Sequence, residues 1–134
     1  LQALILSEKL KMLDSWNEMR HKIALHYDKR LGDCSSIIIP IRASYVDFHA
    51  YHIYTILVDD RDLLQAHLSD LGIPTGIHYK IPIEKTEVCA KLFNFINPRT
   101  LTNSKKMLSL PIHPFLEFRD VDYICDSIIQ GYLR

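Results

Sequence analysis

Residues 75–82 place three side chains that can form hydrogen bonds or exchange protons at the expected end of a strand. His78, Tyr79 and Lys80 follow the apolar residue Ile77 and precede Pro82. Loops at strand ends are where folds commonly present binding and catalytic groups. The same residues also fit a capped strand end whose polar side chains face water. The segment is therefore a candidate site, but it does not by itself define a reaction.

The seven histidines of the chain do not have the spacing of a metal site. His21 and His26 are five residues apart in an expected helix, where their side chains diverge. His49 and His52 are three apart in an expected strand, so they fall on opposite faces. His52 also fits a satisfied polar group on an apolar strand, and His113, between two prolines, also fits a polar residue at a strand end that faces water. Neither HExxH nor CxxC occurs, and we expect no metal site.

The chain also lacks the patterns of a nucleophile or a phosphate-binding loop. Cys89 and Cys125 fall in expected helices, where a free cysteine is usually a small apolar side chain. No GxSxG, Walker A or GxGxxG pattern occurs, and the chain has only four glycines. Its three cysteines lack short spacing, which argues against a disulfide framework. Composition and spacing therefore give no complete active site, and we expect no catalytic residue in this chain.

Length and charge narrow the class of protein. The 134 residues are 48% hydrophobic and 24% charged, which predicts one globular domain with its own core. Sixteen basic residues balance sixteen acidic ones, which argues against a nucleic-acid or anionic-membrane partner. No apolar run is long enough for a membrane span and no signal peptide is visible, so we expect a cytoplasmic protein.

Helices and strands alternate along the chain and must position these residues. Residues 1–31 carry a long helical pattern, and Ser15 and Glu18 have the spacing of a capping box that predicts a break near Leu13. We expect strands at 36–39, 48–58, 75–79 and 108–112, and helices at 61–71, around 87–93, at 104–108 and at 119–132. The predicted fold class is α/β (α+β): a small antiparallel or mixed sheet of about three strands, packed by helices, with a long N-terminal connecting helix.

The strand at 48–58 has two informative faces. One face carries His52, Tyr54, Ile56 and Val58, and the other carries Tyr51, Ile53, Thr55 and Leu57. Because neither face is plainly made for water, the sheet is either covered on both sides or lacks a neighbour. The next helix is expected to bury Leu64, Leu68 and Leu71 and to end at a left-handed Gly72. The last helix is expected to bury Val121, Ile124, Ile128 and Tyr132.

Several segments carry a resemblance when they are taken together and in order. The chain opens with Leu-Gln-Ala-Leu-Ile-Leu at residues 1–6, and Tyr51-His52-Ile53-Tyr54 and Arg61-Asp62 follow. The two most specific strings are Gly72-Ile73-Pro74-Thr75-Gly76-Ile77-His78-Tyr79 and Leu108-Ser109-Leu110-Pro111-Ile112-His113-Pro114. These pieces resemble the C-terminal part of the DegT/DnrJ/StrS sugar aminotransferases. Those enzymes have the aspartate-aminotransferase fold and use pyridoxal phosphate (PLP).

The resemblance implies that residues 1–134 are the small C-terminal domain of such an enzyme, with residues 1–31 as the interdomain helical segment. In the family a large PLP-binding domain comes first and carries the lysine that forms the Schiff base. None of the nine lysines here stands in that context. We therefore expect the large domain to be absent from this sequence, the cofactor PLP to belong to the full-length parent, and this fragment alone to be inactive and to bind no PLP.

The resemblance also implies roles for four residues. His78 and Tyr79 match a family loop that reaches toward the substrate pocket near the dimer interface, where they would hydrogen-bond to the sugar nucleotide. His52 and His113 match positions near the interdomain cleft. One departure follows the His-Tyr pair: Pro82 and Ile83 are followed by Glu84, where many members have a histidine. A carboxylate there reverses the charge preference and leaves the carried-over substrate specificity open.

The implied reaction transfers an amino group from an amino acid such as glutamate, through the cofactor, to a nucleotide-linked keto-sugar. The parent would be a homodimer serving deoxy-amino sugar and cell-surface polysaccharide biosynthesis. A PLP-dependent sugar dehydratase or a sensor of the same family is one alternative, and a stand-alone binding module is another. The parent reading frame separates them: the aminotransferase interpretation fails if fewer than about 150 residues precede Leu1.

Overall fold

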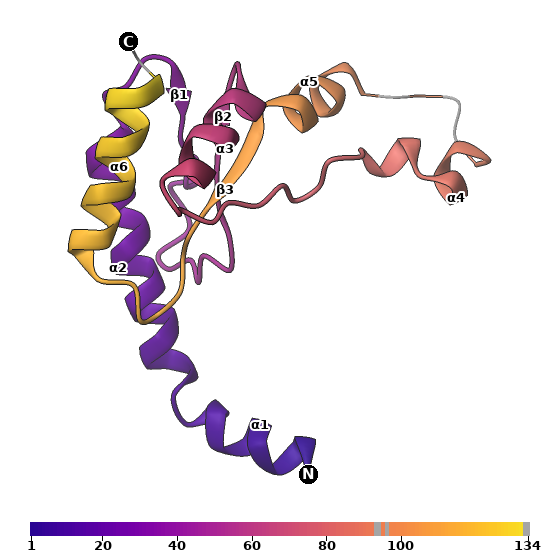
Figure 1. Ribbon diagram of the computed structural model, residues 1–134. Coiled ribbons are helices and arrows are strands. Elements are labelled where there is room, and N and C mark those ends of the chain that lie inside the picture. The colour runs from indigo at the N-terminus through magenta and orange to yellow at the C-terminus, as the bar shows by residue number, and fades with distance from the viewer. Residues whose placement is uncertain (93–94, 96, 133–134) are drawn as a thin grey trace.

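Three short antiparallel strands form a sheet in the order β1-β2-β3, and helices pack on one of its faces (Figure 1). The computed structural model describes residues 1–92, 95 and 97–132. The elements are α1 (Gln2–Leu10), α2 (Leu13–Leu31), β1 (Ile37–Ile38), β2 (Tyr54–Val58), α3 (Arg61–Asp70), η1 (Ile83–Lys85), α4 (Glu87–Ala90), α5 (Pro98–Lys106), β3 (Met107–Leu110) and α6 (Phe118–Tyr132). The predicted fold class is confirmed.

The two faces of the sheet differ because side chains alternate along each strand. In β2, Tyr54, Ile56 and Val58 are buried, while the residues between them are half-buried. In β3, Leu110 pairs with Tyr54 and Leu108 with Ile56, so these leucines share the buried face. The core forms where this face meets α2, α3 and α6.

The three core helices contribute apolar stripes at helical spacing. α2 buries Ile23, Ala24, Tyr27 and Leu31; α3 buries Leu64 and Leu68; α6 buries Val121, Ile124, Cys125 and Ile128. α6 packs against both α2 and α3. Gly72, just after α3, has φ +74°, which confirms the expected left-handed position. A continuous core of this kind gives the 134-residue chain the means to fold.

The first helix lies outside this core. α1 extends away from the sheet and its helices (Figure 1) and contains no buried residue. Leu1, Leu4, Leu6 and Leu10 are each at least 64% exposed. The expected break near Leu13 is confirmed, since α1 ends at Leu10 and α2 begins at Leu13. The prediction of a capping box at Ser15 and Glu18 is wrong. Met12 is the N-cap, and the Ser15 hydroxyl lies inside the helix and donates to the Met12 carbonyl, 2.8 Å away.

The strand predicted at 48–58 is wrong in its first half, because β2 begins only at Tyr54. The preceding backbone is bound to α2 instead of to a strand. Arg20 Nε donates to the Ala50 carbonyl at 3.1 Å, and His21 Nδ1 lies 3.2 Å from the His49 carbonyl oxygen. Tyr51 also has φ +44°, which breaks the extended conformation.

The segment 75–79 is also not a strand. Only Gly76 pairs with β3, through an isolated bridge to Ser109. The chain then turns, and the ring of His78 binds the Ser109 side chain in place of a ladder bond. Likewise, Leu71 is not part of the buried stripe of α3, because the helix ends at Asp70 and Leu71 is 41% exposed.

The helix predicted at 104–108 is longer than expected, since α5 already begins at Pro98. Asn97 is its N-cap, with a side-chain oxygen that accepts from the Arg99 amide at 2.9 Å. The predicted helix end at Phe93 and the predicted inward side chain of Tyr132 lie outside what the structure describes. None of the helices in the described ranges is long and apolar enough to cross a bilayer.

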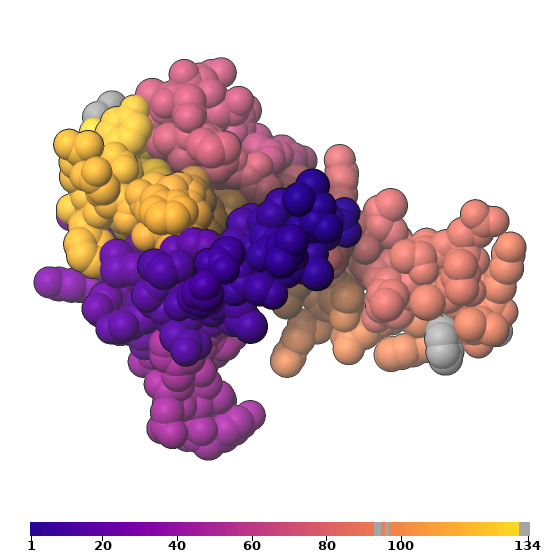
Figure 2. Space-filling model, turned by 90° about the horizontal axis from the view of Figure 1, so that it is seen from below, coloured from indigo at the N-terminus to yellow at the C-terminus, as the bar shows by residue number. Residues whose placement is uncertain are grey.

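A second projection carries η1 and α4, which extend away from the sheet as a separate lobe (Figure 2). This lobe exposes apolar side chains, including Ile81, Ile83, Val88 and Leu92. Together with α1, it gives the molecule two apolar extensions beyond its core.

Candidate functional site

The sheet face opposite the core carries a polar pair. Thr55 and Ser109 are direct partners in the β2–β3 ladder, and they alternate with the buried residues. Thr55 Oγ1 lies 2.9 Å from Ser109 Oγ. Two neighbouring hollows share Ile53 on this face. We call them the loop hollow, which Thr55 lines, and the histidine hollow, which Ser109 lines.

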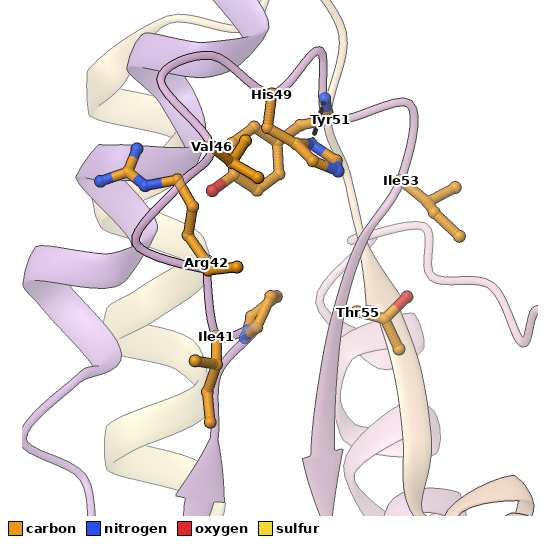
Figure 3. Close-up of a pocket in the computed structure, with 9 residues that line it drawn as sticks. Ile41, Arg42, Val46, His49, Tyr51, Ile53 and Thr55 are labelled. Atoms are coloured by element: carbon orange, nitrogen blue, oxygen red, sulfur yellow. Dashed lines mark hydrogen bonds between the residues drawn. The ribbon is translucent and has the colours of Figure 1, made fainter.

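The loop hollow has a volume of about 450 Å³ and lies between residues 40–51 and β2. Figure 3 shows Val46, His49 and Tyr51 gathered at the tip of the loop, with Ile53 and Thr55 on the strand side. The Tyr51 amide donates to His49 Nδ1 at 3.0 Å, which stabilises the positive φ of Tyr51. A strained residue held in this way is a frequent feature of functional sites.

The phenol of Tyr51 in the loop hollow has a raised pKa. Burial raises its pKa, the negative charge of Asp28 raises it further, and the positive charge of Arg42 acts in the opposite direction. The phenol is therefore neutral near pH 7 and able to donate a hydrogen bond.

The histidine hollow brings together two of the four predicted substrate-binding residues. His52 and His78 line the same space of about 240 Å³ with Ser109. His78 Nδ1 lies 3.0 Å from Ser109 Oγ. The ring lies against the backbone of Gly76, where an added Cβ would stand 2.6 Å from His78 Cε1. Glycine is therefore required at this position for the observed ring placement.

The other two predicted residues do not line this hollow. Tyr79 is 77% exposed and lines a separate hollow with Arg99 and Asn103. His113 follows β3 and its Nδ1 accepts from the Phe115 amide at 3.3 Å. The Phe115 ring packs edge-on against Trp16 of α2. The described chain thus places His52 and His78 in one hollow that neither Tyr79 nor His113 lines, although the rings of His78 and Tyr79 meet edge-on with centroids 6.0 Å apart.

Glu84, the residue that departs from the resemblance, lies in η1. One of its carboxylate oxygens is buried and forms no hydrogen bond with any part of the chain that the structure describes. Ile83, Cys89 and Phe95 surround it. A desolvated, unpaired carboxylate is costly, which marks Glu84 as a group suited to a partner from outside this chain.

The residues that line the loop and histidine hollows include Arg42, His49, His52 and His78 but no aspartate or glutamate. This composition suits an anionic ligand. Within the described ranges no group of three or more His, Cys, Asp or Glu side chains could hold a metal ion. The arrangement can bind and orient a ligand.

Sequence reasoning did not identify Thr55 and Ser109 as site residues. Their signal was available, because each is a hydroxyl residue inside an otherwise apolar strand. Arg42 and His49 of the loop hollow had no such signal, since their positions depend on the loop that Arg20 and His21 bind.

The fold of the chain is similar to that of solved sugar aminotransferases. The structure of S. venezuelae DesV in complex with a ketimine intermediate superimposes with a TM-score of 0.91 at 32% identity, covering 99% of this chain and 36% of that one. Residues 1–129 match the DegT/DnrJ/EryC1/StrS aminotransferase family. The chain belongs to this family, which confirms the resemblance drawn from several segments along the sequence.

Two curated relatives carry different kinds of name. One is the erythromycin biosynthesis sensory transduction protein EryC1 of Saccharopolyspora erythraea, 35% identical over 98% of this chain and 36% of its own length. Another is the UDP-2-acetamido-2-deoxy-3-oxo-D-glucuronate aminotransferase of Pseudomonas aeruginosa, 32% identical over 96% of this chain and 35% of its own length. The chain thus spans about a third of the length of the relatives it matches.

The lysines of the chain test whether it could hold PLP by itself. A Schiff-base lysine must be desolvated and aimed into a pocket. Eight of the nine lysines are exposed, and the ninth, half-buried Lys106, pairs with Asp59. No lysine lines the loop or histidine hollow. The residues present do not fit the cofactor, so we assign no chemical step on PLP to this chain.

Proposed function

We propose that this chain is the C-terminal domain, residues 1–134, of a PLP-dependent aminotransferase that transfers an amino group from an amino acid, glutamate, to a nucleotide-linked keto-sugar. The observation that carries the proposal is the similarity of the chain over nearly its whole length to sugar aminotransferases. In this proposal the cofactor and its lysine belong to a large domain, and the chain alone is inactive.

The sheet face opposite the core, which we call the open face, would form one wall of the sugar-nucleotide site. His52 and His78 line one hollow of this face, and Arg42 lies in the adjoining one. The absence of carboxylates from both linings favours a ligand that carries a diphosphate. Tyr79 and His113 would contact substrate only where another part of the enzyme closes over them.

Residues 1–31 would be the interdomain segment. α1 has an apolar surface that no residue of the described chain covers, with Leu1 94% and Leu4 71% exposed. A nine-residue helix that buries none of its residues is marginal in water, so α1 requires a covering surface to stay helical. We assign that surface to the large domain. The apolar lobe of η1 and α4 would contact a second subunit in a cytoplasmic homodimer.

The first test uses the 134-residue chain with PLP added. We expect no absorbance of a lysine-bound cofactor and no amino transfer. One lysine-bound PLP per chain would contradict the proposal that the cofactor and its lysine belong to the large domain.

The second test uses the enzyme in which this chain is joined to its large domain. His78→Ala should weaken binding of the sugar nucleotide about tenfold, as expected for the loss of one hydrogen bond, and leave the amino-donor half-reaction intact. His67→Ala is the matched control, because His67 binds the Ser127 carbonyl on the helical side of the sheet. Equal losses in both half-reactions would indicate a structural role for His78.

A sensor of the same family is the second candidate, and the name of the relative EryC1 favours it. A PLP-dependent dehydratase is a further possibility within the same fold. The discriminating residue is the one at the Schiff-base position of the large domain. Transaminase activity with glutamate and a keto-sugar nucleotide would exclude both.

A further inference from the structure

Ser109 lies between two other polar side chains on the open face of the sheet. Its Oγ is 2.9 Å from Thr55 Oγ1 and 3.0 Å from His78 Nδ1. Ser109 is only 4% exposed, so its hydroxyl is largely withdrawn from bulk water. Three side chains therefore form a hydrogen-bonded chain that runs from the sheet to the histidine hollow.

The backbone around this chain of side chains is fixed on both sides. Thr55 and Ser109 are ladder partners. Gly76 and Ser109 exchange two backbone hydrogen bonds, of 3.0 Å and 2.7 Å. Because Gly76 has no Cβ, the His78 ring can approach close enough for its Nδ1 to reach Ser109.

The chemistry of the three groups favours one direction of donation. An unprotonated imidazole nitrogen is a stronger acceptor than a hydroxyl oxygen, so the strongest acceptor is used when Nδ1 is unprotonated, Ser109 donates to it and Thr55 donates to Ser109. An imidazole whose Nδ1 accepts carries its proton on Nε2. Within the described chain Nε2 of His78 forms no hydrogen bond, and His78 lines the histidine hollow.

We propose that Ser109 is a positioning residue for His78, which fixes the ring and its tautomer so that Nε2–H is presented to the histidine hollow as a hydrogen-bond donor. The consequence for binding rests on the proposed function: Nε2–H would donate to an oxygen of the sugar nucleotide. The tautomer itself does not depend on that function.

The first experiment measures ring nitrogens in the 134-residue chain labelled with ¹⁵N-histidine. Long-range ¹H–¹⁵N correlations should show His78 as the Nε2–H tautomer. In Ser109→Ala its signals should move toward those of a freely exposed imidazole, for which His52 in the same spectrum is the reference. An Nδ1–H tautomer in the wild-type chain would overturn the proposal, and this readout stands even where Ser109→Ala fails to fold.

Ser127→Ala is the matched control. Ser127 is also a buried serine, on α6, and its hydroxyl donates to the Tyr123 carbonyl at 2.8 Å. Its replacement removes the same atom at the helical side of the sheet, so the His78 signals should stay unchanged. Equal movement in both variants would mean a general loosening of the fold and would overturn the proposal. Unchanged His78 signals in Ser109→Ala would also overturn it.

The second experiment measures KM and kcat in the two-domain enzyme. Ser109→Ala should raise KM for the sugar substrate about threefold to tenfold, and it should add nothing in a His78→Ala background. If the increases in KM of the two single variants add up in the double variant, Ser109 does not act through His78 and the proposal is overturned. If His78→Ala leaves this KM unchanged while the wild-type tautomer is Nε2–H, the proposed substrate contact fails and the positioning by Ser109 is supported.

Discussion

Replacing Tyr54 by phenylalanine removes a single oxygen from the centre of the core. The Tyr54 hydroxyl donates to Asp28 Oδ1 at 2.7 Å, and the side chain is fully buried. Its ring stacks on Tyr27 with centroids 4.9 Å apart, a contact that phenylalanine retains. Burial, followed by the hydrogen bond to Asp28, raises the pKa of Tyr54, so the hydroxyl remains a donor at all ordinary pH values. The substitution therefore isolates one hydrogen bond to a carboxylate.

The expected cost follows from the charge of the acceptor. A hydrogen bond to a charged group contributes about 1.5–3 kcal/mol to the free energy of unfolding. In the variant, Asp28 loses the hydroxyl that donates to it. An unfolding entropy of about 2.1 cal/mol/K per residue makes each kcal/mol worth about 3.5 °C in a chain of 134 residues. We expect Tyr54→Phe to lower Tm by about 5–10 °C.

Urea and thermal unfolding followed by circular dichroism at pH 7 measure this loss. Tyr45→Phe is the matched control, because it removes the same oxygen from a side chain that is 87% exposed, and it should change stability by less than about 0.5 kcal/mol. Equal stability of the two variants would refute the reasoning, since it would mean that water replaces Tyr54 at Asp28 without cost.

Three further predictions concern other parts of the chain. Burial raises the pKa of Cys125 to about 12, so iodoacetamide at pH 8 should alkylate it on the order of a hundredfold more slowly than half-buried Cys34, as followed by mass spectrometry; equal rates would contradict its burial. The hydrogen bond from His26 lowers the pKa of folded Asp122 below the value near 4 of the unfolded chain. The ionised carboxylate therefore stabilises the fold above about pH 4, and this contribution is lost as the pH falls through the pKa of the folded state. Urea unfolding between pH 2 and pH 6 should show Asp122→Asn less stable than wild type at pH 6, with a difference that shrinks as the pH falls. Gly72→Ala should cost about 1 kcal/mol, because Gly72 has φ +74° with open space around it; Gly72→Asn should cost less, and no loss in the alanine variant would exclude a left-handed residue there.

Elements with strong local signals were predictable from the sequence. The helical spacing of Leu64 and Leu68, followed by Gly72, identified α3, and the alternation of Tyr54, Ile56 and Val58 identified the buried face of β2. The break before Leu13 was also visible, although its capping chemistry was not. These features depend on neighbours in the sequence, which is why periodicity finds them.

Errors occurred where distant contacts decide the local structure. Residues 48–53 have strand composition, but Arg20 and His21 bind the carbonyls of Ala50 and His49 and hold that segment on α2. Tertiary contacts of this kind override strand propensity. For the site, the sequence identified His52 and His78 as candidates, whereas their common hollow depends on the distant pairing of Gly76 with Ser109.

That pairing also determines how anything can approach the sheet. β3 is an edge strand, and its outer edge is already bridged at Ser109 by Gly76, while β1 at the other edge has only two ladder residues. Little free backbone remains for another chain to add a strand by β-augmentation. A ligand on this face would therefore meet side chains such as Arg42, His52 and His78. Recognition by side chains can change by single substitutions without altering the fold, so one scaffold can serve different substrates.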